Sequence, residues 1–225
     1  MTDIWRLTGI AALSVALLAG CAGDGEPRSS GRLQVDSGRA YNEGDFPLAL
    51  EGYLKVLERR PGSAQAHFDV GRTQLELGES VSAREHLTVA LDLDPENSVY
   101  LDALADAMLA TGELDELFGL LERRAEEGDG YSGYLRVGRV AERLGLVDEA
   151  EQAYRKAVAL QPRESAKGQA ALANLYARAG DSAQELMRLR VLLYLTPQDE
   201  EIRNRISDLG EVPGPSLALR PDQVD

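Results

Sequence analysis

The sequence predicts an all-α protein built from repeated pairs of helices, and three observations support this fold class. The stretch LGESVSAREHLTVALDLDP, residues 77–95, recurs as LGLVDEAEQAYRKAVALQP, residues 144–162, with six identical residues at the same offsets. Four prolines, at positions 61, 95, 162 and 197, are separated by 34, 67 and 35 residues. Aromatic residues make up only 5 % of a chain rich in alanine and leucine, which favours closely packed helices over sheets. A period in the thirties is typical of a helical array in which each pair of helices covers the apolar face of the next.

The unit at residues 64–97 has the most complete set of landmarks. Its small residues Gly71, Ala83 and Ala90 allow helix axes to approach closely, as ridge-into-groove packing requires. Gly78 is placed for the turn between the two helices, because glycine accepts backbone angles that a side chain would resist. Pro95 has no amide N–H and restricts the residue before it, so it is expected to end the second helix.

Four further units fit this spacing less completely, and they lie at residues 30–63, 98–130, 131–164 and 166–199. The first of them has a weak first helix. The unit at 98–130 departs most, because Leu117 and Arg124 replace the two alanines and the closing proline is missing. We expect the segment GDGYSG, residues 128–133, to form a flexible turn in place of that proline.

The end of the chain predicts one more helix and an extended tail. In residues 200–210 an apolar face follows acidic residues, which is typical of a helix that caps the last unit of an array. Residues 211–225 carry three prolines. We expect partial packing of this tail, because Leu217 and Leu219 need an apolar surface.

The beginning of the chain is typical of a secreted lipoprotein. Residues 1–20 contain Arg6 and an apolar run that is too short to span a bilayer, as in a signal peptide. Leu18-Ala19-Gly20-Cys21 resembles a bacterial lipobox, and Cys21 is the only cysteine of the chain. The resemblance implies lipid attachment (a diacylglyceryl group with palmitate-type chains) at Cys21, followed by a flexible tether over residues 21–31. Ala22 after the cysteine favours the outer membrane over retention in the inner membrane.

Charge and motif content argue against several classes of function. The net charge of −14 repels phosphate backbones, so a nucleic-acid partner is not expected. The pattern GxGxxG at residues 128–133 does not follow a predicted strand, so it does not indicate a dinucleotide site. His67 and His86 are expected to be structural, because no further ligand cluster accompanies them. We therefore expect no enzymatic activity, no cofactor, no metal and no small-molecule substrate.

The landmarks of residues 30–199 resemble the tetratricopeptide repeat (TPR), which implies a solenoid of about five helix-turn-helix units over residues 32–199. In such arrays the first helices of the units line a concave groove that binds protein partners. Carried over to this sequence, the groove residues are Phe68, Arg72, Leu75, Glu76, Asp102, Asp106, Leu109, Leu135, Arg139, Glu142, Arg143, Asn174 and Arg178. This set is acidic and apolar in its middle and more basic toward the C-terminal end. Alternatively, these side chains pair with one another, for instance Arg72 with Asp102.

The architecture of a lipobox followed by about five TPR units is similar to that of lipoproteins from type IV and tight-adherence (Flp) pilus assembly. We therefore expect a periplasmic scaffold, anchored to the outer membrane, that binds protein partners during assembly of a pilus or secretion system. Two alternatives remain from the sequence. One is a regulator or tether of peptidoglycan enzymes, and the other is an adaptor for polysaccharide export or outer-membrane protein assembly.

Overall fold

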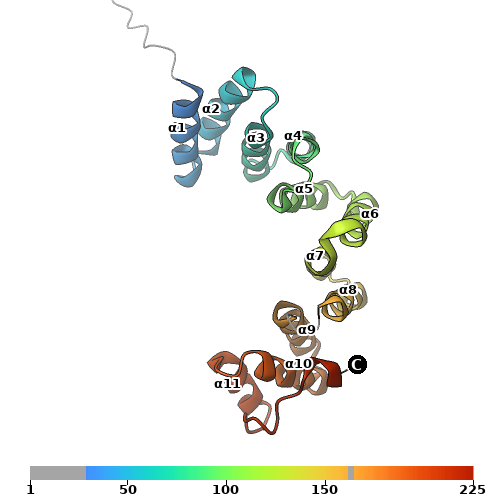
Figure 1. The fold of residues 1–225 in the computed structure, drawn as a ribbon. Helices are drawn as coiled ribbons and strands as arrows, with labels where there is room; N and C mark the ends of the chain where they lie inside the picture. The colour runs from blue at the N-terminus through green and yellow to red at the C-terminus, as the bar shows by residue number, and fades with distance from the viewer. Residues whose placement is uncertain (1–28, 162–164, 225) are drawn as a thin grey trace, which may run out of the picture. The chain divides into compact units, whose positions relative to one another are not determined.

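The computed structural model describes residues 29–161 and 165–224, and within these ranges its regular structure is helical, with no strand (Figure 1). The α-helices are α1 (Ser30–Asn42), α2 (Phe46–Arg59), α3 (Ala64–Glu76), α4 (Ser80–Leu93), α5 (Ser98–Thr111), α6 (Leu114–Arg124), α7 (Gly130–Arg143), α8 (Val147–Leu160), α9 (Ala166–Ala179), α10 (Ser182–Leu195) and α11 (Glu200–Asp208). Neighbouring helices pack as the hairpins α1–α2, α3–α4, α7–α8 and α9–α10. The predicted all-α fold of helical hairpins is confirmed.

The chain divides into two compact units, and the division falls inside α5. Unit 1 ends at Tyr100, and unit 2 begins at Leu101. The predicted signal peptide at residues 1–20, Cys21, most of the predicted tether and Pro162 lie outside the described residues. Among the described helices, none combines the length and the apolar character needed to cross a bilayer.

In unit 1 the hairpins are held together where small residues meet large ones. A Cβ atom on Gly71 of α3 would lie 2.7 Å from Cγ of Leu87 and 3.1 Å from the carbonyl oxygen of Ala83, both on α4. Ala83, Leu87 and Ala90 are fully buried. The close approach predicted at this position is therefore present, and only a hydrogen atom fits between the two helices. The weak first helix of residues 30–63 forms α1, which is capped by the Ser29 side chain accepting from the Arg32 N–H.

The turn inside each hairpin contains a glycine with a positive φ angle. Gly78 has a φ of 76°, in the left-handed region that favours glycine. Nearly the same angle, between 74° and 80°, is found at the equivalent glycines of the other hairpins, Gly44, Gly145 and Gly180, and at Gly112 between α5 and α6. Each glycine lets the chain reverse within two or three residues, which keeps the paired helices in contact.

In unit 2 the α7–α8 hairpin repeats the packing of α3–α4 with a different partner for the glycine. Gly138 of α7 faces the ring of Tyr154 on α8, and Ala150 and Ala157 of α8 are fully buried. Tyr154 belongs to a core cluster that continues into α9 through Leu172, Leu175 and Tyr176. This cluster joins successive hairpins, as an array requires.

The junction after the divergent third unit is helical, so the expected flexible turn at residues 128–133 is wrong. After α6, residues Ala125–Asp129 form one π-helical turn, and α7 begins directly at Gly130, where φ is 48°. Gly133 allows the close approach, because its Cβ would lie 2.6 Å from Cα of Ala125. Without a proline to end α6, the backbone continues as a widened helix and turns at Gly130.

The C-terminal segment closes unit 2. Ile202 and Ile206 of α11 pack against Leu189, Leu192 and Leu193 of α10, as expected of the capping helix, which ends at Asp208 rather than at residue 210. The tail then crosses the same surface, where Leu217 and Ala218 are partly buried against the cluster. The Leu219 N–H donates to the Arg190 carbonyl at 3.0 Å, and Arg190 Nε donates to the Leu217 carbonyl at 2.8 Å. The expected packing of the proline-rich tail is therefore present.

Candidate partner-binding surface

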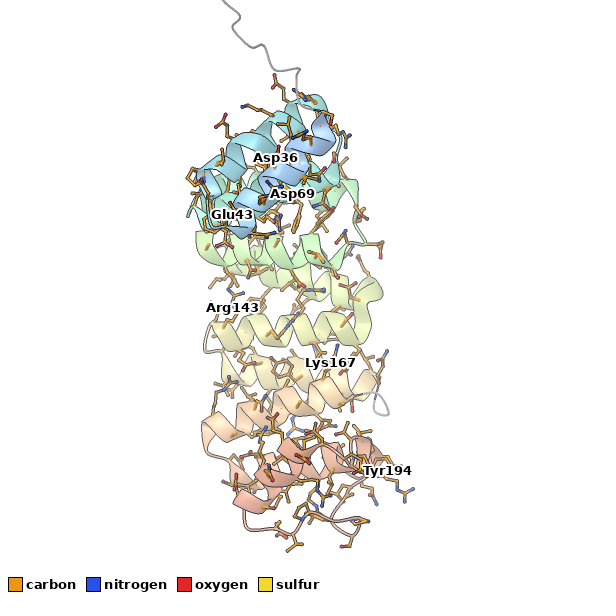
Figure 2. The ribbon with its side chains drawn as sticks, turned by 90° about the vertical axis from the view of Figure 1, so that its left-hand side faces the viewer. Asp36, Glu43, Asp69, Arg143, Lys167 and Tyr194 are labelled. Atoms are coloured by element: carbon orange, nitrogen blue, oxygen red, sulfur yellow. The ribbon has the colours of Figure 1, made fainter. Side chains whose placement is uncertain are left out.

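The best-formed part of the predicted groove lies in unit 2, between α5 and α7. Asp102, Ala105 and Asp106 share one face of α5, because residues three and four apart in a helix are neighbours. Residues of α7 with the same spacing face them. Together they line an open pocket of about 310 Å³, formed by Asp102, Ala105, Asp106, Arg136, Arg139, Val140 and Arg143. The structure thus brings four of the predicted groove residues together, namely Asp102, Asp106, Arg139 and Arg143 (Figure 2 labels Arg143).

The base of this pocket is fixed by Arg136, which the sequence analysis did not select. Its side chain is only 7 % exposed and spans two carboxylates. Nε lies 2.5 Å from Oδ1 of Asp102, and Nη1 lies 2.9 Å from Oδ2 of Asp129. A buried guanidinium needs such partners, because an unpaired buried charge is strongly destabilising. Arg136 therefore holds α5, the π-helical turn and α7 together rather than meeting a ligand.

The rim of the pocket is formed by two more exposed arginines. Arg139 is 61 % exposed and reaches Asp102 only at 3.8 Å. Arg143 is 59 % exposed and pairs with Asp106. Exposed ion pairs contribute about 0–1 kcal/mol, so a ligand can displace them at little cost.

The remaining predicted groove residues of unit 2 are engaged between neighbouring helices. Glu142 accepts from the Tyr154 hydroxyl at 2.6 Å and pairs with Arg178 of α9. Arg205 of α11 donates to Oδ1 of Asn174 at 2.7 Å. The predicted basic end of the groove is thus neutralised in part by Glu142. Leu135 packs against the core cluster of α7–α9, and Leu109 is half-buried.

In unit 1 the predicted groove residues form an aromatic cluster around Arg72. The Arg72 guanidinium lies 4.1 Å from the centre of the Tyr41 ring, and its Nε lies 3.2 Å from Oδ1 of Asp69. The Tyr41 hydroxyl donates to Glu76 at 3.1 Å. Phe68 packs against Tyr100 with ring centres 4.9 Å apart, and Leu75 is half-buried.

The alternative that groove side chains pair with one another is met by three pairs in unit 2, Asp102–Arg139, Asp106–Arg143 and Glu142–Arg178. Arg72 instead pairs with Asp69, which lies outside the predicted set. Burial raises the pKa of Asp69, although hydrogen bonds from Gln65 and the Arg72 charge act in the opposite direction. Asp69, labelled in Figure 2, is only 3 % exposed, so it supports the packing of α3 and is not available to a partner.

Besides Arg136, two further features of the structure were not predicted from the sequence. The first is a second pocket of about 310 Å³ between α6, α7 and α8, whose apolar lining is Leu114, Phe118, Tyr134, Val137, Leu146 and Ala153. The second is a contact between His67 of α3 and His86 of α4, whose Nδ1 atoms lie 3.1 Å apart. Burial and the nearby His67 lower the pKa of His86. This contact follows the repeat register, because Gln169 and Arg188, each 102 residues further on, also meet.

These observations define a helical-repeat protein whose exposed pockets lie on helix faces. Tetratricopeptide-repeat family models match residues 39–98 and 131–164. The helices in these two ranges match the tetratricopeptide repeat, and the chain has the tetratricopeptide-repeat fold. Repeats of this kind mediate protein–protein interactions, and the fold is typical of non-enzymatic scaffolds.

Solved structures share this fold at low sequence identity. A thermophilic TPR protein of Thermus thermophilus, TTC0263, is 23 % identical, with a TM-score of 0.51, over 80 % of this chain and 98 % of its own. MamA of Desulfovibrio magneticus RS-1 is 19 % identical, with a TM-score of 0.53, over 76 % and 97 % of the two chains. A TPR protein of Parabacteroides merdae is 19 % identical, with a TM-score of 0.56, over 81 % and 73 %. A search of curated proteins gave no significant match.

Proposed function

We propose that this protein is a scaffold that binds an acidic segment of a partner protein in the pocket between α5 and α7. The observation that carries this proposal is the position of Arg139 and Arg143 on the pocket rim, each about 60 % exposed. A guanidinium has five N–H donors, and each of these arginines contacts one carboxylate of the pocket. A carboxylate of the partner can share or replace those contacts in the paired geometry that arginine favours.

The apolar lining of the pocket sets what else the partner presents. Ala105 and Val140 are buried beneath the arginines and form an apolar floor. An acidic residue next to a small apolar residue on the partner would therefore satisfy both the rim and the floor. Binding of a short segment in this way fits the helix-in-groove mode of recognition, in which the anchor residues follow the spacing of a helix.

The experiment is a co-purification with charge reversal. The double variant Arg139→Glu/Arg143→Glu is expected to lose the partner, while its helical circular dichroism stays unchanged. The matched control is Arg123→Glu/Arg203→Glu, which makes the same change in net charge at two exposed arginines of unit 2 outside the pocket. Equal recovery of the partner with all three proteins would remove this pocket from consideration.

We also propose that the scaffold is attached to the periplasmic face of the outer membrane by lipid on Cys21. The support is the resemblance of residues 18–21 to a lipobox. The variant Cys21→Ser is expected to move the protein from the membrane fraction to the soluble periplasmic fraction. Mass spectrometry of the mature N-terminus gives an independent reading, and a terminus without acyl chains would contradict this proposal.

Among envelope machines, assembly of a pilus or secretion system is our leading proposal, supported by architecture alone. A deletion strain is then expected to lose surface fibres or adherence while growing normally. Altered cell shape or lysis would instead favour a regulator or tether of peptidoglycan enzymes. Defects in capsule or porins would favour an adaptor for polysaccharide export or outer-membrane protein assembly.

A further inference from the structure

The imidazole rings of His67 and His86 lie against each other in unit 1. The two rings belong to opposite helices of one hairpin, with centres 5.3 Å apart and planes inclined by 41°. Their Nδ1 atoms face each other at 3.1 Å. Both side chains are half-buried rather than enclosed in the core.

The other ring nitrogen of His67 fixes its tautomer. His67 Nε2 lies 3.0 Å from the Pro61 carbonyl oxygen, which can only accept a hydrogen bond. Nε2 therefore carries the hydrogen atom, and in the neutral ring the Nδ1 lone pair points toward His86. A histidine that ligates a metal through one nitrogen usually donates the other N–H to a carbonyl or carboxylate in this way.

The distance between the two Nδ1 atoms matches the separation of two ligands on one metal ion. With metal–nitrogen bonds of about 2.0–2.1 Å, two nitrogens lie about 2.9 Å apart in square-planar geometry and about 3.3 Å apart in tetrahedral geometry. The observed 3.1 Å lies between these values.

Other residue types occupy the equivalent pair of positions in the other repeats. Counting by the repeat register, the pair corresponds to Leu33 and Gly52 in the first unit and to Tyr134 and Ala153 in the fourth. In the fifth unit it corresponds to Gln169 and Arg188, which form a buried polar contact at 3.4 Å. Hairpin packing therefore accepts apolar, small or amide side chains here, and two imidazoles are a particular property of the second unit.

We propose that His67 and His86 bind one divalent transition-metal ion, zinc, nickel or copper, through their Nδ1 atoms. Imidazole suits these three ions, and copper is expected to bind most tightly. Within the part of the chain that the structure describes, no group of three or more His, Cys, Asp or Glu side chains is arranged to hold a metal. The site therefore has two protein ligands, and water fills the other positions. A bound ion links α3 to α4 and stabilises that hairpin.

The test is a titration of tag-free protein with Zn²⁺ and Cu²⁺, followed by calorimetry and thermal unfolding. Cys21→Ser is used as the background, because it removes the site of lipid attachment and also the thiol, which is itself a metal ligand in protein without lipid. The proposal predicts one ion per chain and a midpoint of unfolding that rises with the logarithm of metal concentration. With Cu²⁺, electron paramagnetic resonance is expected to show coupling to two nitrogens.

The variants decide the assignment. His67→Gln and His86→Gln are each expected to weaken binding at least tenfold and to leave one coupled nitrogen in the copper spectrum. The control His67→Gln/His86→Arg reproduces the pair found at Gln169 and Arg188, so it keeps a hairpin contact without a metal ligand. If the parent protein binds no more tightly than this control, the histidines form only a contact between helices, and the proposal is overturned.

Discussion

Replacing Gly138 by alanine tests whether the helices approach as closely as the structure shows. A Cβ atom at this position would lie 2.3 Å from Cε1, 2.5 Å from Cδ1 and 2.9 Å from Cζ of Tyr154. Carbon atoms in contact prefer about 3.5–4.0 Å, so the ring would have to move by about 1 Å. Tyr154 is 1 % exposed and packed among Ala141, Ala150 and Leu172, so it has no space to move into.

The size of the effect follows from three contributions. Overpacking a well-filled core costs about 1–3 kcal/mol, and the rigid aromatic ring places this site in the upper part of that range. Displacing the ring also strains the 2.6 Å hydrogen bond from the Tyr154 hydroxyl to Glu142, whose loss costs about 1 kcal/mol. Alanine gains about 1 kcal/mol over glycine inside a helix. We expect Gly138→Ala to lower the free energy of unfolding by about 2–3 kcal/mol.

Gly119 of α6 provides the matched control. Apart from the backbone of its own helix, the nearest atom to a Cβ added there would be Nη1 of Arg123 at 3.6 Å, which is an ordinary contact. Gly119→Ala is therefore expected to raise the free energy of unfolding by up to about 1 kcal/mol. Urea unfolding followed by circular dichroism measures both variants. In a Tyr154→Ala background the cost of Gly138→Ala should disappear, since the opposing ring is gone. If Gly138→Ala is as stable as Gly119→Ala in the parent protein, the described approach of α7 and α8 is wrong.

Three further predictions concern unit 2. Leu117→Ala restores the alanine expected from the repeat pattern, but Leu117 is fully buried. Urea unfolding should therefore show that the free energy of unfolding falls by about 2–5 kcal/mol. An unchanged midpoint would contradict the place of Leu117 in the core. Asp181→Ala removes the oxygen that accepts from the Gln184 N–H at the start of α10, and thermal unfolding should show a loss of about 1 kcal/mol, against no loss for Ser182→Ala. Burial raises the pKa of Glu151, but hydrogen bonds from Tyr176 and Arg155 outweigh it and lower the pKa overall. Its stabilisation is therefore present above the ordinary glutamate pKa of about 4.3 and is lost as the pH falls through the lowered value. Glu151→Gln should make urea midpoints less sensitive to pH between about 5 and 3, and an unchanged pH profile would refute this assignment.

The hairpins could be predicted from the sequence because their determinants are local. A turn glycine such as Gly78 and a small residue such as Gly71 act within one unit, where the helical period fixes what they meet. The resemblance to the tetratricopeptide repeat also implied that Asp102, Asp106, Arg139 and Arg143 line one groove, and the structure places all four around one pocket.

Features that depend on contacts between elements could not be predicted in the same way. The π-helical turn at Ala125–Asp129 is accompanied by a close approach of Ala125 to Gly133, which no local pattern encodes. The choice of Asp102 as the partner of Arg136 depends on how two hairpins are offset, which differs from the offset inside a hairpin. The contact between His67 and His86 differs from these two features because it follows the repeat register. Residues 19 apart meet in the second and fifth units alike.

Site-specific photo-crosslinking tests the central functional claim most directly. A photoreactive amino acid at Asp106, on the rim of the pocket between α5 and α7, is compared in living cells with one at Arg203 of α11. We predict one dominant protein adduct from position 106, its absence from position 203, and its loss when Arg143 is changed to Glu. Adducts of equal yield from both positions, or an adduct at 106 that survives the charge reversal, would contradict partner binding in this pocket.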